Sequence, residues 1–271
     1  MKQVLSPVLI LGALSILPIE AYAQNDDTDS KWTFTVGTGV FATPTYLGDD
    51  DIQLSIFPNL RIEYDNRLIL GFDGAEYAVV RTDNLRLGPV FRFQFGRDED
   101  GSNPLAITNT DNTDLVGLGD VDGTPELGGF VEYSLSSFTA RVEARQGIGG
   151  HDGFIGEADV TYNHSFDLGA RQAFVSIGPS ISFGDSSFNS AFFDVNAEQS
   201  LASGLSTFDA DGGINSVGVG VNFFRPLTDK ISVAIFADYD RLLGDIADSS
   251  LVQERGSENQ FTGGLFLNYT F

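Results

Sequence analysis

The sequence predicts an all-β protein, a transmembrane antiparallel up-and-down β-barrel of about 12 strands, preceded by a cleaved signal peptide. Three observations support this fold class. Apolar and polar residues alternate along the mature chain, short and long connections alternate between these segments, and the chain stops on an apolar strand that ends at Phe271. A bacterial outer-membrane barrel needs an apolar band toward lipid and tolerates a polar lumen, which is what such alternation produces.

The N-terminal segment, residues 1–23, is expected to be a secretory signal peptide. Lys2 precedes an apolar run from Val4 to Leu17, and Ala21-Tyr22-Ala23 places small residues at the two positions that signal peptidase requires. The run of about 14 residues is shorter than the roughly 20 that a spanning helix needs. Residues 24–271 are then one barrel domain, which begins with a short acidic lead-in at 24–31.

Twelve strands are expected because alternation with a period of two recurs through the domain. Within residues 138–145, every even residue is apolar, including the small Ala140, and every odd residue is polar or charged. The third and fourth strands could instead be one strand that kinks between Gly71 and Gly74. The expected strands cover residues 32–41, 52–64, 67–73, 75–82, 84–97, 125–135, 137–148, 153–166, 170–184, 213–225, 230–243 and 260–271.

The connections predict which end of the barrel faces the periplasm. Twelve strands put all the short turns at one end, as is usual for the periplasmic end of these barrels. These turns lie at 64–67, 82–84, 135–138, 166–169 and 227–230. The other links then face outward, at about 42–51, 98–124, 149–152, 185–212 and 244–259.

The last strand is the clearest single element. One face carries only apolar residues, while the other is polar or small with Phe266 as its exception. A terminal strand of this kind closes an outer-membrane barrel and carries the signal read by the insertion machinery. The apolar face comprises Phe261, Leu265, Leu267, Tyr269 and Phe271.

Composition excludes several classes of protein. The chain has no Cys, so it is not a lipoprotein and has neither disulfides nor thiolate chemistry. A formal net charge of −23 argues against nucleic acid as a partner. The 31 Gly and 23 Phe are a balance typical of barrels, in which glycine lets strands bend and aromatic residues form girdles at the membrane interfaces.

Charged residues are expected to point into the lumen from many strands. They admit two interpretations, a selective lining for a small cation or polar solute, or a network of ion pairs that fills the barrel. We favour the structural network. The residues are Arg61, Glu63, Arg86, Arg92, Glu126, Glu132, Arg141, Glu143, Arg145, Glu157, Asp159, Asp238 and Asp240.

No enzymatic activity is expected, and no catalytic, cofactor-binding or metal-binding residue is assigned. His164 and Ser165 are adjacent on a strand, so they face opposite ways and cannot act as base and nucleophile. His151-Asp152 offers two metal ligands without a third at suitable spacing. The acidic runs at 49–51 and 98–100 lack the ligand pattern of an EF-hand, and we interpret them as solvated loops rather than as loose sites for divalent ions.

Two segments resemble the MipA/OmpV family of Gram-negative outer-membrane proteins. The first runs from Phe192-Phe193-Asp194-Val195 to Gly213, and the second from Arg241-Leu242-Leu243-Gly244-Asp245 to Gln260. Residues 43–51, His151-Asp152-Gly153 and the Tyr-x-Phe end fit the family too. Ile246 stands where the family usually has Ala, and Ser250 where it usually has Pro.

The resemblance implies a non-enzymatic outer-membrane barrel, likened to MltA-interacting proteins, for which a scaffold role in peptidoglycan synthesis is proposed. The alternative is a channel or uptake barrel for a small solute or cation; an outer-membrane hydrolase comes third. Expected partners are outer-membrane lipids, lipopolysaccharide and murein-processing proteins, with no cofactor and no nucleic acid. The outer links 185–212 and 244–259 are too apolar to extend into water, so we expect them to fold over the barrel mouth and pack together.

Overall fold

The computed structural model of this chain describes residues 30–101, 103, 105–108 and 112–271. The expected signal peptide at 1–23 and most of the acidic lead-in lie outside this part of the chain. The described strands form one antiparallel sheet, and the pairing of β4 with β6 closes it into a barrel. The strands are β1 (Trp32–Pro44), β2 (Ile52–Tyr64), β3 (Leu68–Leu70), β4 (Gly74–Tyr77), β5 (Val80–Arg81), β6 (Leu85–Gln94), β7 (Thr124–Leu135), β8 (Phe138–Gly147), β9 (Phe154–Leu168), β10 (Arg171–Gly184), β11 (Gly213–Pro226), β12 (Ile231–Leu242) and β13 (Asn259–Thr270).

The barrel has twelve strand positions, as expected, because β4 and β5 share one position. Both pair with β6, through Glu76 opposite Val90 and through Val80 opposite Leu87. The step from 76 to 80 is one residue longer than the facing step from 90 to 87, as in a β-bulge. The strand predicted at 75–82 is therefore this bulged pair.

The third and fourth expected strands are separate, so the alternative of one kinked strand is wrong. The Gly71 N–H donates to the Gly74 carbonyl at 2.8 Å and closes a tight turn between β3 and β4. Gly74 has a φ of +156°, and a Cβ at this position would lie 2.0 Å from the Phe91 carbonyl oxygen, so glycine is required. This early turn leaves β3 with three residues and β4 with four, beside a β2 of thirteen.

Side chains alternate between an apolar outer surface and a largely polar interior, as predicted. On β8, Val142 is 55% exposed, whereas Glu143 is 5% exposed. On the terminal strand, Leu265 and Leu267 are exposed, whereas Asn268, between Leu267 and Tyr269, is buried. An exposed apolar belt of this kind is what a strand facing lipid must present.

An aromatic cluster fills part of the interior and explains the exception in the last strand. Phe41 of β1, Phe57 of β2, Phe236 of β12 and Phe266 of β13 are buried together. The rings of Phe41 and Phe266 meet edge to face with their centroids 4.9 Å apart, an arrangement that aromatic pairs favour. Phe266 therefore belongs to the packed interior.

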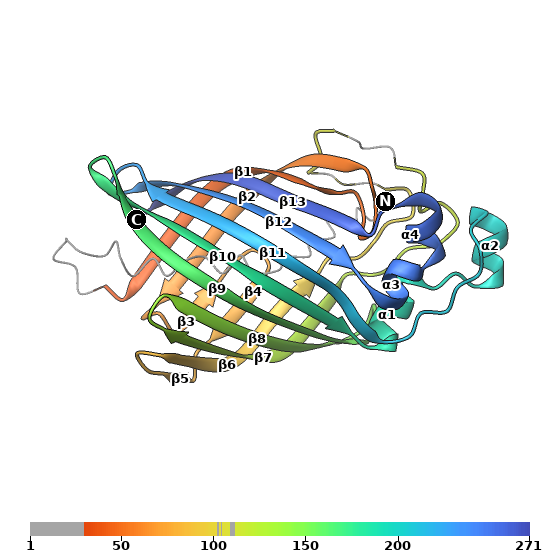
Figure 1. Cartoon of the computed structure of the whole chain (residues 1–271), viewed down its shortest axis with the longest axis horizontal. Coiled ribbons are helices and arrows are strands. Elements are labelled where there is room, and N and C mark those ends of the chain that lie inside the picture. The colour runs from red at the N-terminus through yellow and green to blue at the C-terminus, as the bar shows by residue number, and fades with distance from the viewer. Residues whose placement is uncertain (1–29, 102, 104, 109–111) are drawn as a thin grey trace.

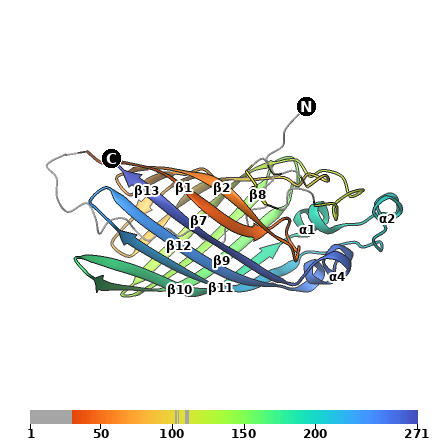
Figure 2. The same ribbon diagram turned by 90° about the horizontal axis from the view of Figure 1, so that it is seen from above.

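The two ends of the barrel differ, as Figures 1 and 2 show. Short turns lie beside the C-terminus, and residues with positive φ such as Asp65, Asn66 and Ser136 form them. Helices gather at the other end, and among the described residues none is long and apolar enough to cross a membrane. They are α1 (Ser186–Phe193), α2 (Ala197–Ser203), α3 (Gly244–Asp248) and α4 (Ser250–Arg255).

The helices and the links beside them, residues 45–51, 112–122, 185–212 and 243–258, form what we call the cap. Phe192 and Phe193 are almost fully buried with Ile246 of α3, in a core that also includes Leu242 at the end of β12. The Asp245 carboxylate accepts a hydrogen bond from the Asp211 N–H at 2.7 Å and joins the two outer links. The prediction that these links fold back and pack together is confirmed.

Candidate functional site: a charged lumen beneath a cap

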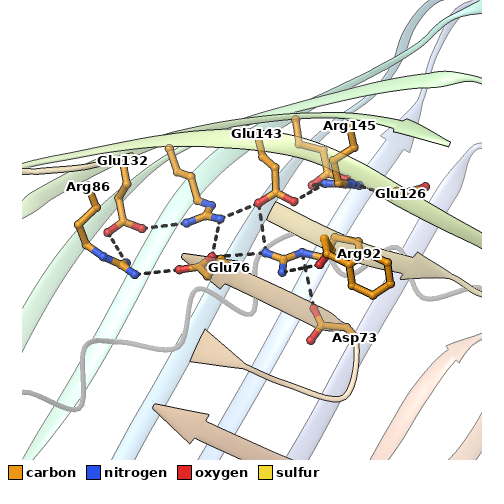
Figure 3. Close-up of polar contacts among 11 residues, drawn as sticks. Asp73, Glu76, Arg86, Arg92, Glu126, Glu132, Glu143 and Arg145 are labelled. Atoms are coloured by element: carbon orange, nitrogen blue, oxygen red, sulfur yellow. Dashed lines mark hydrogen bonds and ion pairs between the residues drawn. The ribbon is translucent and has the colours of Figure 1, made fainter. Parts of the chain in front are cut away.

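Four arginines and four glutamates form a continuous network on one inner wall, which we call the ladder (Figure 3). Its side chains occupy inward positions of neighbouring strands, so register alone brings opposite charges together. Glu132 of β7 is the register partner of both Arg86 on β6 and Arg141 on β8. The ladder comprises Glu76, Arg86, Arg92, Glu126, Glu132, Arg141, Glu143 and Arg145.

Glu76 is the point at which three arginines converge. Its two oxygens lie 2.8 Å from a nitrogen of Arg86, 2.8 Å from one of Arg141 and 3.5 Å from one of Arg92. The Arg141 guanidinium also lies over the Phe130 ring at 4.4 Å, so its apolar face is covered as well. The carboxylate that joins β6 to β8 thus comes from the short strand β4.

Glu143 continues the ladder toward the cap. It lies 2.6 Å from Arg141, 3.2 Å from Arg92 and 2.7 Å from Arg145. Arg145 in turn pairs with Glu126 at 2.7 Å and with Glu157 at 3.0 Å. Every guanidinium is held by more than one carboxylate, so removing one charge leaves others buried without full compensation.

His151 ties the outer link 149–152 to the end of the ladder. Its Nδ1 accepts a hydrogen bond from the Gly153 N–H at 3.0 Å, so the proton of the neutral ring is on Nε2, which donates to Glu126 at 3.0 Å. Asp152 instead accepts from the Gly149 N–H in the same turn. The two side chains thus have separate structural partners.

The opposite wall carries carboxylates without such arginine partners. Asp238 and Asp240 on β12 lie over glycines of β11, where a Cβ at Gly220 or Gly218 would come within 2.3 or 2.1 Å of them. No ion pair is found for these two within the described residues. Asp159 also forms none, although it lies beside the ladder on β9 as the register partner of Arg141. Glycine thus makes room in the wall for acidic side chains that face the lumen.

A cavity of about 130 Å³ lies between the ladder and the cap. Arg92, Glu143 and Arg145 form its charged side, while Phe188 and Ile246 belong to its apolar side. The cavity is therefore amphipathic. Among the described residues no group of three or more His, Asp or Glu is placed to hold a metal ion.

The cap contains ionisable groups that are buried outside the membrane-spanning strands. Asp49 is 1% exposed and accepts hydrogen bonds from Thr45 and from Asn112, the latter at 2.8 Å. Burial raises the pKa of Asp49 to about 6, although hydrogen bonds from the Thr45 hydroxyl and the Asp51 N–H oppose the rise. Outside the cap, in the link after β6, Arg97 donates to the Phe192 carbonyl, and burial lowers the pKa of Arg97 to about 10.

The interpretation of residues 49–51 as a solvated acidic loop is therefore wrong for Asp49. Asp50 and Asp51 are exposed, but Asp49 is enclosed because links far apart in the sequence fold over it. In the second acidic run, Glu99 accepts hydrogen bonds from the N–H groups of Gly117 and Gly119 and fixes a neighbouring link. Both acidic segments thus have structural contacts.

The thirteen predicted lumen residues occupy the inward positions of their strands, and the parity of residue number along each strand is enough to predict this facing. Sequence reasoning missed Glu76. The pattern Ala75-Glu76-Tyr77, with one charged residue between two outward residues, indicates an inward Glu76. The strand has only four residues, so its alternation is hard to recognise. His164 stacks beside Tyr162 on the outer face, with the two ring centroids 6.3 Å apart.

Comparison with known proteins places this fold in a family. A sequence model described as MltA-interacting protein MipA matches residues 36–271. No curated protein matches the chain significantly.

Several solved structures share the barrel fold with low similarity. The COG4313 outer membrane channel from Pseudomonas putida F1 is 14% identical, with 92% of this chain and 98% of that chain covered and a TM-score of 0.43. A bacterial polysaccharide outer membrane secretin is 8% identical, with 90% and 100% covered and a TM-score of 0.45. The NanC porin is 7% identical, with 88% and 98% covered and a TM-score of 0.39. Structures this distant do not indicate what this chain does.

Proposed function

This chain belongs to the MltA-interacting protein MipA family, and from that membership we propose that it is a non-enzymatic scaffold of the cell envelope. The protein is a β-barrel of the bacterial outer membrane. In the proposed role it holds a murein-processing enzyme, of the kind that gives the family its name, at the periplasmic face. The barrel would then supply a rigid, membrane-fixed platform rather than a path for solutes.

The observation that supports a scaffold most is the packing along the inner wall of the barrel and over its outer end. The ladder crosses several strands inside the barrel, and the cap packs over its outer end with a core of its own. A channel needs a continuous wet path, whereas a platform gains from a filled interior that keeps its turns in fixed positions. The periplasmic face would be built from the short turns, which include the exposed pair of Arg171 and Asp229 at 2.8 Å.

A crosslinking pull-down from intact cells tests the scaffold. The full chain should capture a lytic murein transglycosylase, and a charge reversal at the turns, Arg171→Glu with Lys230→Glu, should reduce the capture. Replacing α2 at the outer end by a Gly-Ser link is the matched control, because it alters the opposite face. If the folded full chain captures no such enzyme, or if only the α2 variant loses it, the proposal fails.

A second candidate is a channel or uptake barrel for small cations. The feature that favours it is the set of lumen carboxylates that form no ion pair with an arginine among the described residues. Asp238 and Asp240 lie on the wall opposite the ladder, and Asp159 lies beside the ladder on β9. Conductance in planar bilayers distinguishes the two functions. Steady, cation-selective steps from the full chain would favour the channel, and their absence would favour the scaffold.

A further inference from the structure

The barrel wall is incomplete beside β2. The short strand β3 pairs only with Ile62–Tyr64 at the lower end of β2. Near its upper end, the Ile56 N–H donates to the Leu105 carbonyl at 3.0 Å. Between these points, no described residue pairs its backbone with Phe57–Arg61 on this side. At about 3.3 Å per residue this stretch is roughly 16 Å long, and we call it the lateral gap.

The sequence of β2 is adapted to this gap. Ile56 directs its N–H toward this side, and alternation along the strand directs the backbone groups of residues 58 and 60 the same way. Residue 58 is proline, which has no N–H and so leaves no donor unpaired there. Proline is normally confined to strand edges, and Pro58 stands at an edge in the middle of a closed barrel.

Aromatic side chains, rather than backbone pairing, occupy the lateral gap. The Phe72 ring, from the β3–β4 turn, meets the Phe57 ring at 4.6 Å and the Phe95 ring at 5.9 Å. Phe72 is 39% exposed, while Phe57 and Phe95 are buried. Phe57 also contacts Phe41 at 5.6 Å, so the rings run without a break from the exposed Phe72 to the aromatic cluster in the lumen.

The surroundings identify what lies against the gap. Leu54, Ile56 and Leu60 beside it are exposed on the outer surface, within the apolar belt that faces lipid. On the inner side, Phe95 and Asp73 also line the cavity beneath the cap. We propose that the lateral gap is an acyl-chain site: the tail of a membrane lipid enters between β2 and the β3–β4 turn and lies against Phe57, Phe72 and Phe95.

The chain's single tryptophan makes a direct test possible. With Trp32→Phe as background, one tryptophan is placed at Phe57, facing inward at the gap, and the protein is refolded into vesicles of brominated phosphatidylcholine. Ile56→Trp, outward on the same strand, is the fully lipid-exposed control. Phe266→Trp, inward but on β13 away from the gap, is the shielded control. Heat-modifiable migration establishes that each variant is folded.

The expected result is that bromine quenches Phe57→Trp nearly as much as Ile56→Trp and far more than Phe266→Trp. Adding Phe72→Ala should increase the quenching, because it removes the ring that partly fills the gap. Quenching of Phe57→Trp as weak as that of Phe266→Trp would overturn the proposal, and dimerisation in the same vesicles would then assign the surface to a second copy. If Phe57→Trp does not fold, Phe95→Trp on the other side of Phe72 replaces it with the same controls and the same deciding outcomes.

Discussion

Glu76 is the residue whose charge the interior depends on most, because three guanidinium groups meet at its two oxygens. Glu76→Gln keeps the size of the side chain but leaves the surrounding arginines partly uncompensated in a buried setting. Breaking a buried ion pair by removing one partner costs about 3–5 kcal/mol. We therefore expect the free energy of unfolding to fall by about this amount, as measured by urea unfolding in lipid vesicles.

Asp229→Asn is the control for this measurement. Its carboxylate pairs with Arg171 at the exposed end that carries the short turns, where ion pairs contribute about 0–1 kcal/mol. Equal losses from the two variants would mean that the ladder is solvated and does not stabilise the barrel.

Asp49 predicts a pH dependence of the cap. Burial raises the pKa of Asp49 in the folded cap to about 6 from an ordinary value of 3.8, so the folded state binds the proton more tightly than the unfolded state does. The contribution of Asp49 to the stability of the folded cap is therefore greater below about pH 4 than above pH 6. It falls as the pH rises between these values. Hydrogen exchange of the cap amides should accelerate from pH 4 to pH 7 beyond the intrinsic chemical rate.

Asp49→Asn should flatten this dependence, since an amide does not titrate, whereas Asp50→Asn at the exposed neighbouring position should leave it in place. A cap whose protection is constant over this pH range in the unmodified chain would contradict the assignment of Asp49 as a buried acid.

At the scale of the element, each strand has one face toward lipid and one toward the lumen. On β12, Ile235 is exposed in the apolar belt while Asp238 faces inward over Gly220. A lysine toward lipid near the bilayer midplane costs about 2–4 kcal/mol. Ile235→Lys should therefore impair refolding into vesicles by this amount, and Asp238→Lys, which places the same charge beside Asp240 in the lumen, should impair it much less. Similar effects would place the register of β12 one residue away.

Elements of ordinary length followed their sequence pattern closely, and the short ones did not. The predicted strand 52–64 is β2 residue for residue, because thirteen alternating positions leave only one register that keeps the apolar residues toward lipid. The strand predicted at 67–73 shrinks to Leu68–Leu70, since the turn from Gly71 to Gly74 needs residues that alternation alone assigned to a strand.

At the scale of the whole molecule, the cap covers one end of the barrel and the ladder lines one wall of the lumen beneath it. Replacing residues 188–208 by a short Gly-Ser link removes α2 and most of α1, together with the core contacts of Phe192 and Phe193. We expect this variant to show a higher conductance in planar bilayers than the full chain, because water gains access to the cavity above the ladder. An unchanged conductance, together with protease cleavage near Phe192 in intact cells carrying the full chain, would show that the cap is loose.

The sequence by itself determined the number of strands, their facing and the two different ends. All three properties follow from local rules. The parity of a residue along a strand sets whether its side chain faces lipid or lumen, and the length of a link indicates the end of the barrel at which it lies. The expectation that the apolar outer links fold inward has the same local origin, since Phe192 and Phe193 are costly to expose to water.

Only the tertiary structure decided which residues meet across the interior. Glu76 pairs with Arg141, Asp49 is buried against Asn112, and Pro58 stands beside an interrupted wall because of how the sheet is staggered when β4 closes on β6. That stagger is a property of the closed barrel as a whole, set jointly by all its strand pairings, and no periodicity within one strand contains it.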